Sequence, residues 1–225
     1  MFNQLPSATK ATKALMTRLN LIHNYKHDVF PPQFRRDNLI FLPIPGSGGD
    51  LFLDAYLGFQ INPLTVEQCF RSDRLFFGSA FVYAFVRNPV DRFLTAMRLA
   101  AAGQELRGLS SLRHDLSRLG SGVEAMATNL EATSPLLEHP LLRPQHQFLR
   151  YKEKLYVDRV FKAETWDIDL ALLREITGIK LRTPDLQQVE AALSTDNDSS
   201  PPLSLAAKAN LQRVYQEDFE LFGYA

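Results

Sequence analysis

The chain of 225 residues has little cysteine and no excess of charge of either sign. Cys69 is the only cysteine, which excludes an internal disulfide and a cysteine-rich zinc site and fits a reducing compartment. Lysine plus arginine and aspartate plus glutamate each number 25, so the formal net charge is zero. We therefore expect no nucleic-acid partner and no metal, and any anion site has to be local.

Long apolar runs are also lacking. The first 22 residues contain no stretch that suits a signal peptide or a membrane anchor, so we expect no transmembrane segment and a cytoplasmic protein. Leu15, Leu19 and Ile22 lie at helical spacing and predict an amphipathic helix, which Pro31 and Pro32 end. We expect a helical extension over residues 1–37.

The hydrophobic content of 45% predicts a globular fold. A chain of 225 residues suffices for one α/β domain with a sizeable core and hardly for two. Buried strands alternate with helical segments along the sequence, which independently favours that class. We therefore expect a single domain over residues 1–225.

The most informative stretch is FVYAFVRNPVDRFLTAMR, residues 81–98. Residues 81–86 are apolar, aromatic or β-branched throughout, which is typical of a strand buried on both faces. Arg87 ends this run, Asn88 suits a helix N-cap and Pro89 suits the first helical position. Ligands of open parallel sheets bind at the carboxyl ends of strands, and a guanidinium there suits a phosphate.

A second strand–turn–helix pattern precedes it. Residues 38–44 predict a buried strand, the turn PGSGGD follows at 45–50, and LFLDAYLGF has helical character. Free amides and the dipole at a helix start favour an anion, and glycines let the backbone approach it. The pattern is neither a Walker sequence nor a dinucleotide fingerprint. A plain glycine turn capped by Asp50 is the alternative interpretation.

Residues 87–95 resemble the R-(N/D)-P-x-(D/E)-R-F/L-x-S/T block of the sulfotransferases that use 3'-phosphoadenylyl sulfate, especially the membrane-associated carbohydrate type and its bacterial relatives. The resemblance implies an α/β fold, a P-loop-like three-layer domain with a central parallel sheet flanked by helices. It implies that Arg87 and Thr95 hold the 3'-phosphate of the donor. It also implies a soluble, bacterial version, since eukaryotic members usually carry an anchor.

The glycine turn matches the family's 5'-phosphosulfate loop, typically I-P-K-T-x-G-T-S-L, only in part. The resemblance implies that Ser47, Gly48 and Gly49 hold the 5'-phosphosulfate. Gly46 stands in place of the lysine that neutralises the leaving oxygen, Asp50 in place of a threonine and Leu51 in place of a serine. Another cation then has to neutralise the charge on the leaving oxygen. Arg143 and Lys162 are the candidates.

Residues 139–149, HPLLRPQHQFL, resemble the family segment H-x-R-P-Q-x-x-F-L. Arg143 falls on its arginine, while Leu141 takes the place of its histidine. A neutral histidine near pH 7 can accept a proton from a sugar hydroxyl. We expect His139, ahead of His146, to be this base, and Arg143 to act beside it.

The remaining segments predict packing elements. Helices are expected at 64–73, 105–119, 122–130 and 166–177, and strand structure at 156–163. Ile168, Leu172 and Ile176 predict the buried face of the helix at 166–177, and Gly178 its C-cap. The block Y-x-x-D-F-x-x-F-G-Y at 215–224 also resembles the family, and we expect it to pack onto the core without a chemical role.

The sequence thus predicts transfer of a sulfuryl group from 3'-phosphoadenylyl sulfate to a hydroxyl of a carbohydrate or lipid acceptor. The alternative is a nucleotide-binding or assembly protein on the same scaffold that has lost catalysis, and the changes at Gly46, Asp50 and Leu51 are the reason to consider it. An enzyme that uses a different phosphate-bearing donor or acceptor is a third possibility.

Overall fold

A three-stranded parallel sheet lies at the centre of the computed structural model, which describes residues 28–59, 61–102, 112–178 and 202–224, without the side chain of Asp50. Its strands are β1 (Leu39–Phe41), β2 (Phe81–Val86) and β5 (Arg159–Lys162), in the order β1-β2-β5. The register pairs Leu39 with Phe81 and Tyr83 with Arg159. The fold is therefore mixed α/β around a small parallel sheet.

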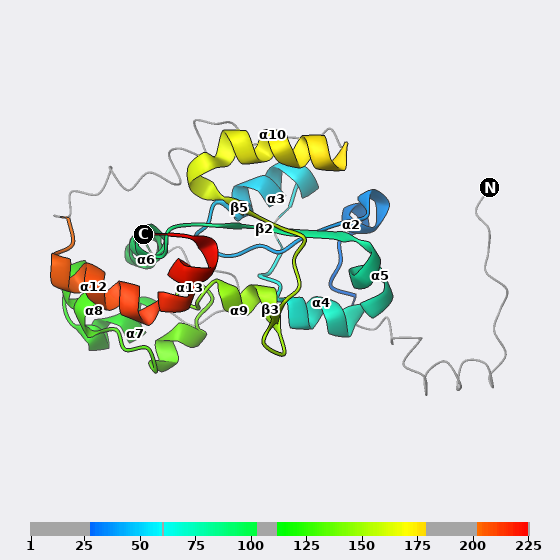
Figure 1. Ribbon diagram of the computed structural model, residues 1–225. Coiled ribbons are helices and arrows are strands. Elements are labelled where there is room, and N and C mark those ends of the chain that lie inside the picture. Colours follow the sequence, from blue (N-terminus) through cyan, green and yellow to red (C-terminus); the bar gives the residue numbers. More distant parts are fainter. Residues whose placement is uncertain (1–27, 60, 103–111, 179–201, 225) are drawn as a thin grey trace, which may run out of the picture.

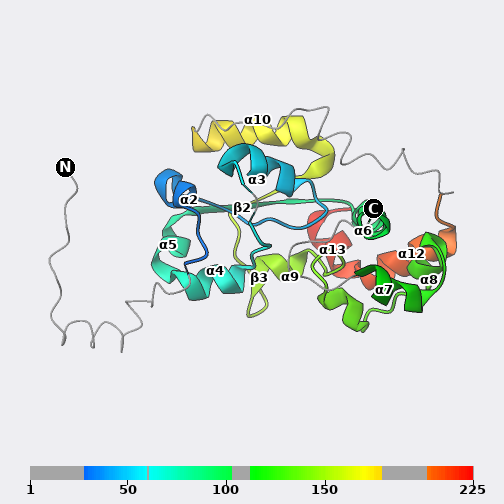
Figure 2. The ribbon, with the colours of Figure 1, turned by 180° about the vertical axis from the view of Figure 1, so that it is seen from behind.

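Helices cover both faces of this sheet (Figures 1 and 2). Helices α3 (Gly49–Leu57) and α10 (Trp166–Thr177) lie on one face, and α4 (Val66–Ser72) and α9 (His146–Leu149) lie on the other. Aromatic rings pack on the first face. The ring centre of Phe52 lies 5.2 Å from that of Phe41, and the ring centre of Trp166 lies 4.4 Å from that of Phe85. Burial of large rings stabilises this packing.

Strand β2 and helix α6 (Pro89–Ala101) form the unit that the sequence predicts. All of β2 except Phe81 is buried. Asn88 caps the helix, since its Oδ1 accepts the N–H of Val90, and Pro89 is the first helical residue. The N-cap, the proline and the buried strand are confirmed.

A second apolar cluster lies beside the sheet, at the end where α6 begins (Figure 1). Its elements are α6, α7 (Leu112–Leu116), η2 (Ser117–Leu119), α8 (Val123–Asn129), η3 (Pro135–Glu138), α12 (Leu205–Val214) and α13 (Gln216–Phe222). Leu211, Tyr215 and Phe219 are buried in it, and Phe222 is buried in the cluster around the sheet. The expected packing of the C-terminal block is confirmed.

Several predicted boundaries are wrong. The strand expected at 38–44 is only β1, because Asn38 takes a left-handed conformation (φ 52°) that ends helix α2 (Pro32–Asp37). The sequence predicts no element at 74–79, where the chain forms helix α5 (Arg74–Ser79), which Asp73 caps. Before β5 the chain forms a two-stranded hairpin, β3 (Arg150–Tyr151) and β4 (Lys154–Leu155), and after β5 comes η4 (Ala163–Thr165).

The predicted buried face of α10 is wrong for Ile168 and Ile176, although Leu172 is partly buried against the core, and the bounds of the helix and its Gly178 cap agree with the sequence. Ile168 and Ile176 are 64% and 45% exposed. The buried residues are Trp166, Leu170 and Leu173. The indole of Trp166 packs on the sheet, and this contact turns the row of Ile168 and Ile176 towards solvent.

The expected extension at 1–37 lies mostly outside the described residues, as do residues 105–111 of a predicted helix. Its last part belongs to the main core, where Phe30 and Phe34 are buried. Arg35 bridges Asp28 and Asp73. Over the described ranges, the helices are too short or too polar for any of them to cross a bilayer.

Candidate functional site

The carboxyl ends of the three parallel strands meet at one edge, as in other open sheets. The glycine turn follows β1, Arg87 follows β2, and Glu164 follows β5. Figure 1 shows this edge beside the start of α6 and the C-terminal end of the chain. The fold therefore places the glycine turn and Arg87, which are predicted to bind the donor, at the carboxyl end of the sheet.

Arg87 and Thr95 contact each other directly. The Nη1 of Arg87 donates to the Thr95 hydroxyl oxygen at 2.8 Å, and both residues are buried, with 4% and 5% of their surface exposed. Burial lowers the pKa of the Arg87 guanidinium, while the charges of Asp91 and then Glu164 oppose that shift. A buried fixed charge, oriented by a neighbouring hydroxyl, is suited to an anion.

The glycine turn is tightly built. Gly46 and Gly48 both have φ of 79°, a left-handed conformation that glycine adopts without strain. A Cβ added at Gly49 would lie 2.6 Å from the Cζ of Phe41, so a larger residue does not fit there. The hydroxyl and the amide of Ser47 both donate to the Ile44 carbonyl, at 2.7 and 3.2 Å. Ser47 therefore uses its donors inside the turn.

Arg92 ties this turn to the segment that carries the predicted catalytic residues. Its Nε donates to the carbonyl of Pro45, its Nη1 to that of Arg143 and its Nη2 to that of Pro140, each at 2.8 Å. Only 2% of Arg92 is exposed, and burial lowers the pKa of its guanidinium. Arg92 has no role among the sequence predictions, although it directly precedes Phe93 on the buried face of α6.

Gln145 is a second residue that sequence reasoning missed. Its side-chain Oε1 accepts the N–H of Arg87 at 2.9 Å, and its Nε2 donates to the Arg87 carbonyl at 2.7 Å. Asp218 in turn accepts the backbone N–H groups of Gln145 and His146, at 2.7 and 2.8 Å. The only available signal was the R-P-Q block, which carries no information on contacts.

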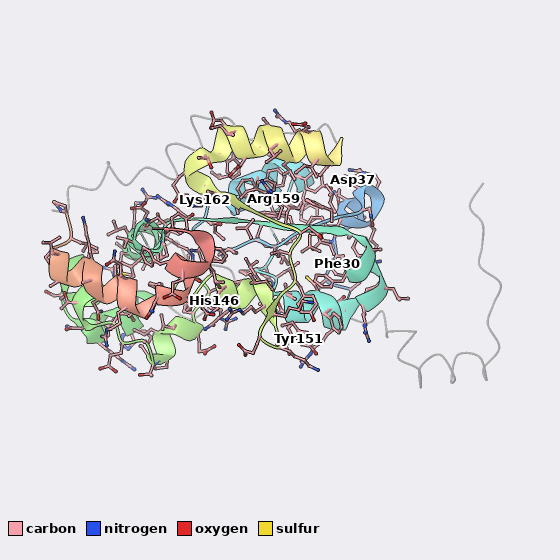
Figure 3. All side chains as sticks on the ribbon, viewed as in Figure 1. Phe30, Asp37, His146, Tyr151, Arg159 and Lys162 are labelled. Atoms are coloured by element: carbon pink, nitrogen blue, oxygen red, sulfur yellow. The ribbon has the colours of Figure 1, made fainter. Side chains whose placement is uncertain are left out.

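The two histidines lie in different surroundings. His139 is half-buried, and its Nδ1 accepts the N–H of Leu141 at 3.3 Å. The ring of His146 lies between two carboxylates, 2.7 Å from Asp218 at Nδ1 and 2.9 Å from Glu217 at Nε2. Figure 3 shows His146 on the side of α9 and α13. His139 directly precedes Pro140, and Arg92 bonds both the carbonyl of Pro140 and that of Pro45 in the glycine turn. His139 is therefore the histidine that is held next to this turn.

The candidate cations both have other partners. Arg143 donates from Nη2 to the backbone carbonyl and to the carboxylate of Glu138, at 3.1 and 3.0 Å. Lys162 donates to the Gly223 carbonyl at 3.2 Å, and its ammonium lies 4.4 Å from the centre of the Tyr224 ring. Figure 3 shows Lys162 at the end of β5 that lies towards the candidate edge.

Glu164 closes the edge on the β5 side. Its carboxylate accepts the Asn88 N–H at 2.6 Å and the Tyr224 hydroxyl at 3.0 Å. Burial, followed by the charge of Glu164, raises the pKa of Tyr224 well above its usual range. Burial also raises the pKa of Asp91, in the first turn of α6. Among the described residues, the buried guanidinium of Arg87 thus feels the charges of two carboxylates at this edge, those of Asp91 and Glu164.

Comparisons of the chain with protein-family models, with curated proteins and with solved structures found no match. In the part of the chain that the structure describes, no three histidine, cysteine, aspartate or glutamate side chains come together as a metal site would require.

Proposed function

We propose that this chain is a P-loop-like, three-layer sulfotransferase that moves a sulfuryl group from 3'-phosphoadenylyl sulfate to a hydroxyl of a carbohydrate or lipid. The observation that carries the proposal is the contact between Arg87 and Thr95 at the carboxyl end of β2. These are the two positions that the sequence resemblance assigns to the 3'-phosphate. We also propose a cytoplasmic location for it.

In this proposal Arg87 supplies charge and donors for the 3'-phosphate, and Thr95 orients the guanidinium. The glycine turn, with Gly48 and Gly49, holds the 5'-phosphosulfate, and Arg92 fixes the turn through Pro45. Transfer at sulfur needs mainly positioning and charge stabilisation, so a rigid frame supports it. His139 is the proposed base for the acceptor hydroxyl.

The second candidate is a nucleotide-binding or assembly protein without catalysis, and the absence of a lysine in the glycine turn favours it. Gly46 provides no charge, and both Arg143 and Lys162 are engaged elsewhere among the described residues. A departing sulfuryl group leaves negative charge on the bridging oxygen, and a cation there lowers the barrier.

Calorimetry with two nucleotides tests the proposal. We expect wild-type protein to bind adenosine 3',5'-bisphosphate more tightly than adenosine 5'-monophosphate. Arg87→Ala should remove most of this preference, because a charge-assisted hydrogen bond contributes about 1.5–3 kcal/mol. Thr95→Val should reduce it less. Arg159→Ala, at the other end of β5, is the matched control (Figure 3).

Equal affinity of the wild-type protein for the two nucleotides would contradict the assignment of Arg87. Incubation with 3'-phosphoadenylyl sulfate and a mixture of simple sugars and hydroxyl-bearing lipids then separates the two candidates. Release of the bisphosphate together with a sulfated sugar or lipid supports the enzyme. Selective nucleotide binding without such products supports the binding protein.

A further inference from the structure

Arg87 lies one residue beyond the end of strand β2 in the described sheet. The ladder between β2 and β5 ends at Val86, which pairs with Lys162. Beyond this point the side-chain amide of Gln145 forms hydrogen bonds with the backbone, because it accepts the N–H of Arg87 and donates to its carbonyl. The backbone position of Arg87 therefore depends on the position of Gln145.

Gln145 is itself held from the C-terminal block. The carboxylate of Asp218, in α13, accepts the amide of Gln145 on Oδ2 and the amide of His146 on Oδ1. The same Oδ1 lies 2.7 Å from the Nδ1 of His146. One carboxylate thus fixes two consecutive peptide groups and the imidazole that follows them.

The whole connection is shielded from water. Gln145 and Asp218 have no exposed surface, and His146 is 8% exposed. Buried hydrogen bonds of this kind are costly to leave unmade, so the network has one favoured arrangement. Glu217 and Arg150 form an ion pair at its outer side, and Glu217 also contacts the Nε2 of His146.

We propose that Asp218 and His146 are positioning residues, which set Arg87 through Gln145 for the 3'-phosphate of the donor. This inference rests on the proposed function. Neither Asp218 nor His146 contacts the Arg87 side chain among the hydrogen bonds of the described residues. Both residues instead fix the position of the Arg87 side chain through Gln145. The C-terminal block therefore contributes to ligand binding as well as to the core.

The measurement is the ratio of the two dissociation constants, for adenosine 5'-monophosphate and for adenosine 3',5'-bisphosphate. This ratio isolates the 3'-phosphate, and a smaller folded fraction does not change it. Asp218→Asn replaces one acceptor with an amide group that faces a buried N–H. We expect the ratio to fall roughly tenfold, the value of one lost hydrogen bond.

Two substitutions at His146 add a test by rescue. His146→Asn keeps a donor at the place of Nδ1 and should retain most of the wild-type ratio. His146→Leu fills the space without a donor and should lower the ratio as Asp218→Asn does. Glu220→Gln makes the same change of charge on an exposed position of α13, where Glu220 contacts only Gln216 in the described structure, and should have no effect.

The outcomes separate the inference from the proposed function. If wild-type protein shows no preference for the bisphosphate, the proposed function fails. If Arg87→Ala removes the preference while folded Asp218→Asn and His146→Leu both keep it, the function stands and the positioning role is overturned. If Asp218→Asn does not fold, the two His146 variants decide the question. The positioning role is overturned if His146→Leu and His146→Asn both keep the wild-type ratio of dissociation constants.

Discussion

The Nε of Arg92 donates to the carbonyl oxygen of Pro45 at 2.8 Å, which joins helix α6 to the turn after β1. The other two nitrogens of the same guanidinium bind the carbonyls of Arg143 and Pro140. A single buried cation therefore holds together three segments that are far apart in the sequence. It makes the glycine turn part of the core and not a free loop.

We expect Arg92→Lys to destabilise the protein by about 3 kcal/mol, because one ammonium cannot reach three carbonyls and each buried unpaired carbonyl costs about 1–3 kcal/mol. Urea unfolding followed by circular dichroism measures this. Arg213→Lys is the control, since Arg213 is exposed on α12 and contacts Asn210. Equal stability of the two variants would show that Arg92 does not hold the segments together.

Gly46→Lys introduces, at a position with φ of 79°, the lysine that the sulfotransferase loop carries there. Its Cβ would lie 3.4 Å from the Cγ of Arg92. We expect a loss of about 1 kcal/mol in stability from the left-handed backbone, and tighter binding of adenosine 3',5'-bisphosphate from the added charge. Melting curves and calorimetry measure the two effects.

Gly58→Lys is the matched control for this substitution. Gly58 has φ of 77° and nothing within 4 Å of an added Cβ. A lysine there therefore has the same backbone strain but lies outside the glycine turn after β1. Its nucleotide affinity should equal that of the wild type. Weaker binding by a folded Gly46→Lys variant would count against a donor loop at this turn. The combined change Gly46→Lys and Asp50→Thr extends the test by removing a negative charge.

Deletion of the chain from Leu211 onward should abolish soluble expression. It removes Leu211, Tyr215, Phe219 and Phe222, each at most 8% exposed. Each large buried side chain contributes about 1.5–3 kcal/mol, and the sum approaches the whole stability of a typical domain. A chain shortened only by residues 224–225 keeps all four and should remain soluble. Cooperative melting of the longer deletion would show that the block is peripheral.

Asp73 should make the protein sensitive to acid. Burial of its carboxyl acts to raise its pKa, but the N–H groups of Phe76 and Leu75 and the guanidinium of Arg35 outweigh this and lower it. A lowered pKa means that the stabilisation is complete above the unfolded value, about 3.9, and is lost as the pH falls through the folded value.

Asp73→Asn keeps the cap of α5 but removes the charge. We expect it to be about 0.5–1 kcal/mol less stable than wild type at pH 7, with the difference shrinking below pH 4. Urea unfolding at pH 7 and at pH 2.5 measures both values, and Asp167→Asn, exposed on α10, is the control. A difference that stays constant with pH would exclude a role for the Asp73 charge.

The sequence alone determined the local units of this protein. An unbroken apolar run followed by Arg87, Asn88 and Pro89 leaves few alternatives to a buried strand and a capped helix, because caps and prolines act within a few residues. The bounds of α10 and its Gly178 cap follow from the same local rules. Arg87 and Thr95 belong to this same strand–helix unit, although the direct bond between them is known only from the structure.

Tertiary structure alone decided the rest. The face that α10 buries depends on Trp166 meeting Phe85, and the amphipathic pattern of Ile168 and Ile176 carries no trace of that contact. Gln145 reaches Arg87 across 58 positions, and Asp218 reaches Gln145 across 73. Such long-range polar contacts leave no periodic signal, because they depend on which segments the folded core brings together and not on the residues beside them in sequence.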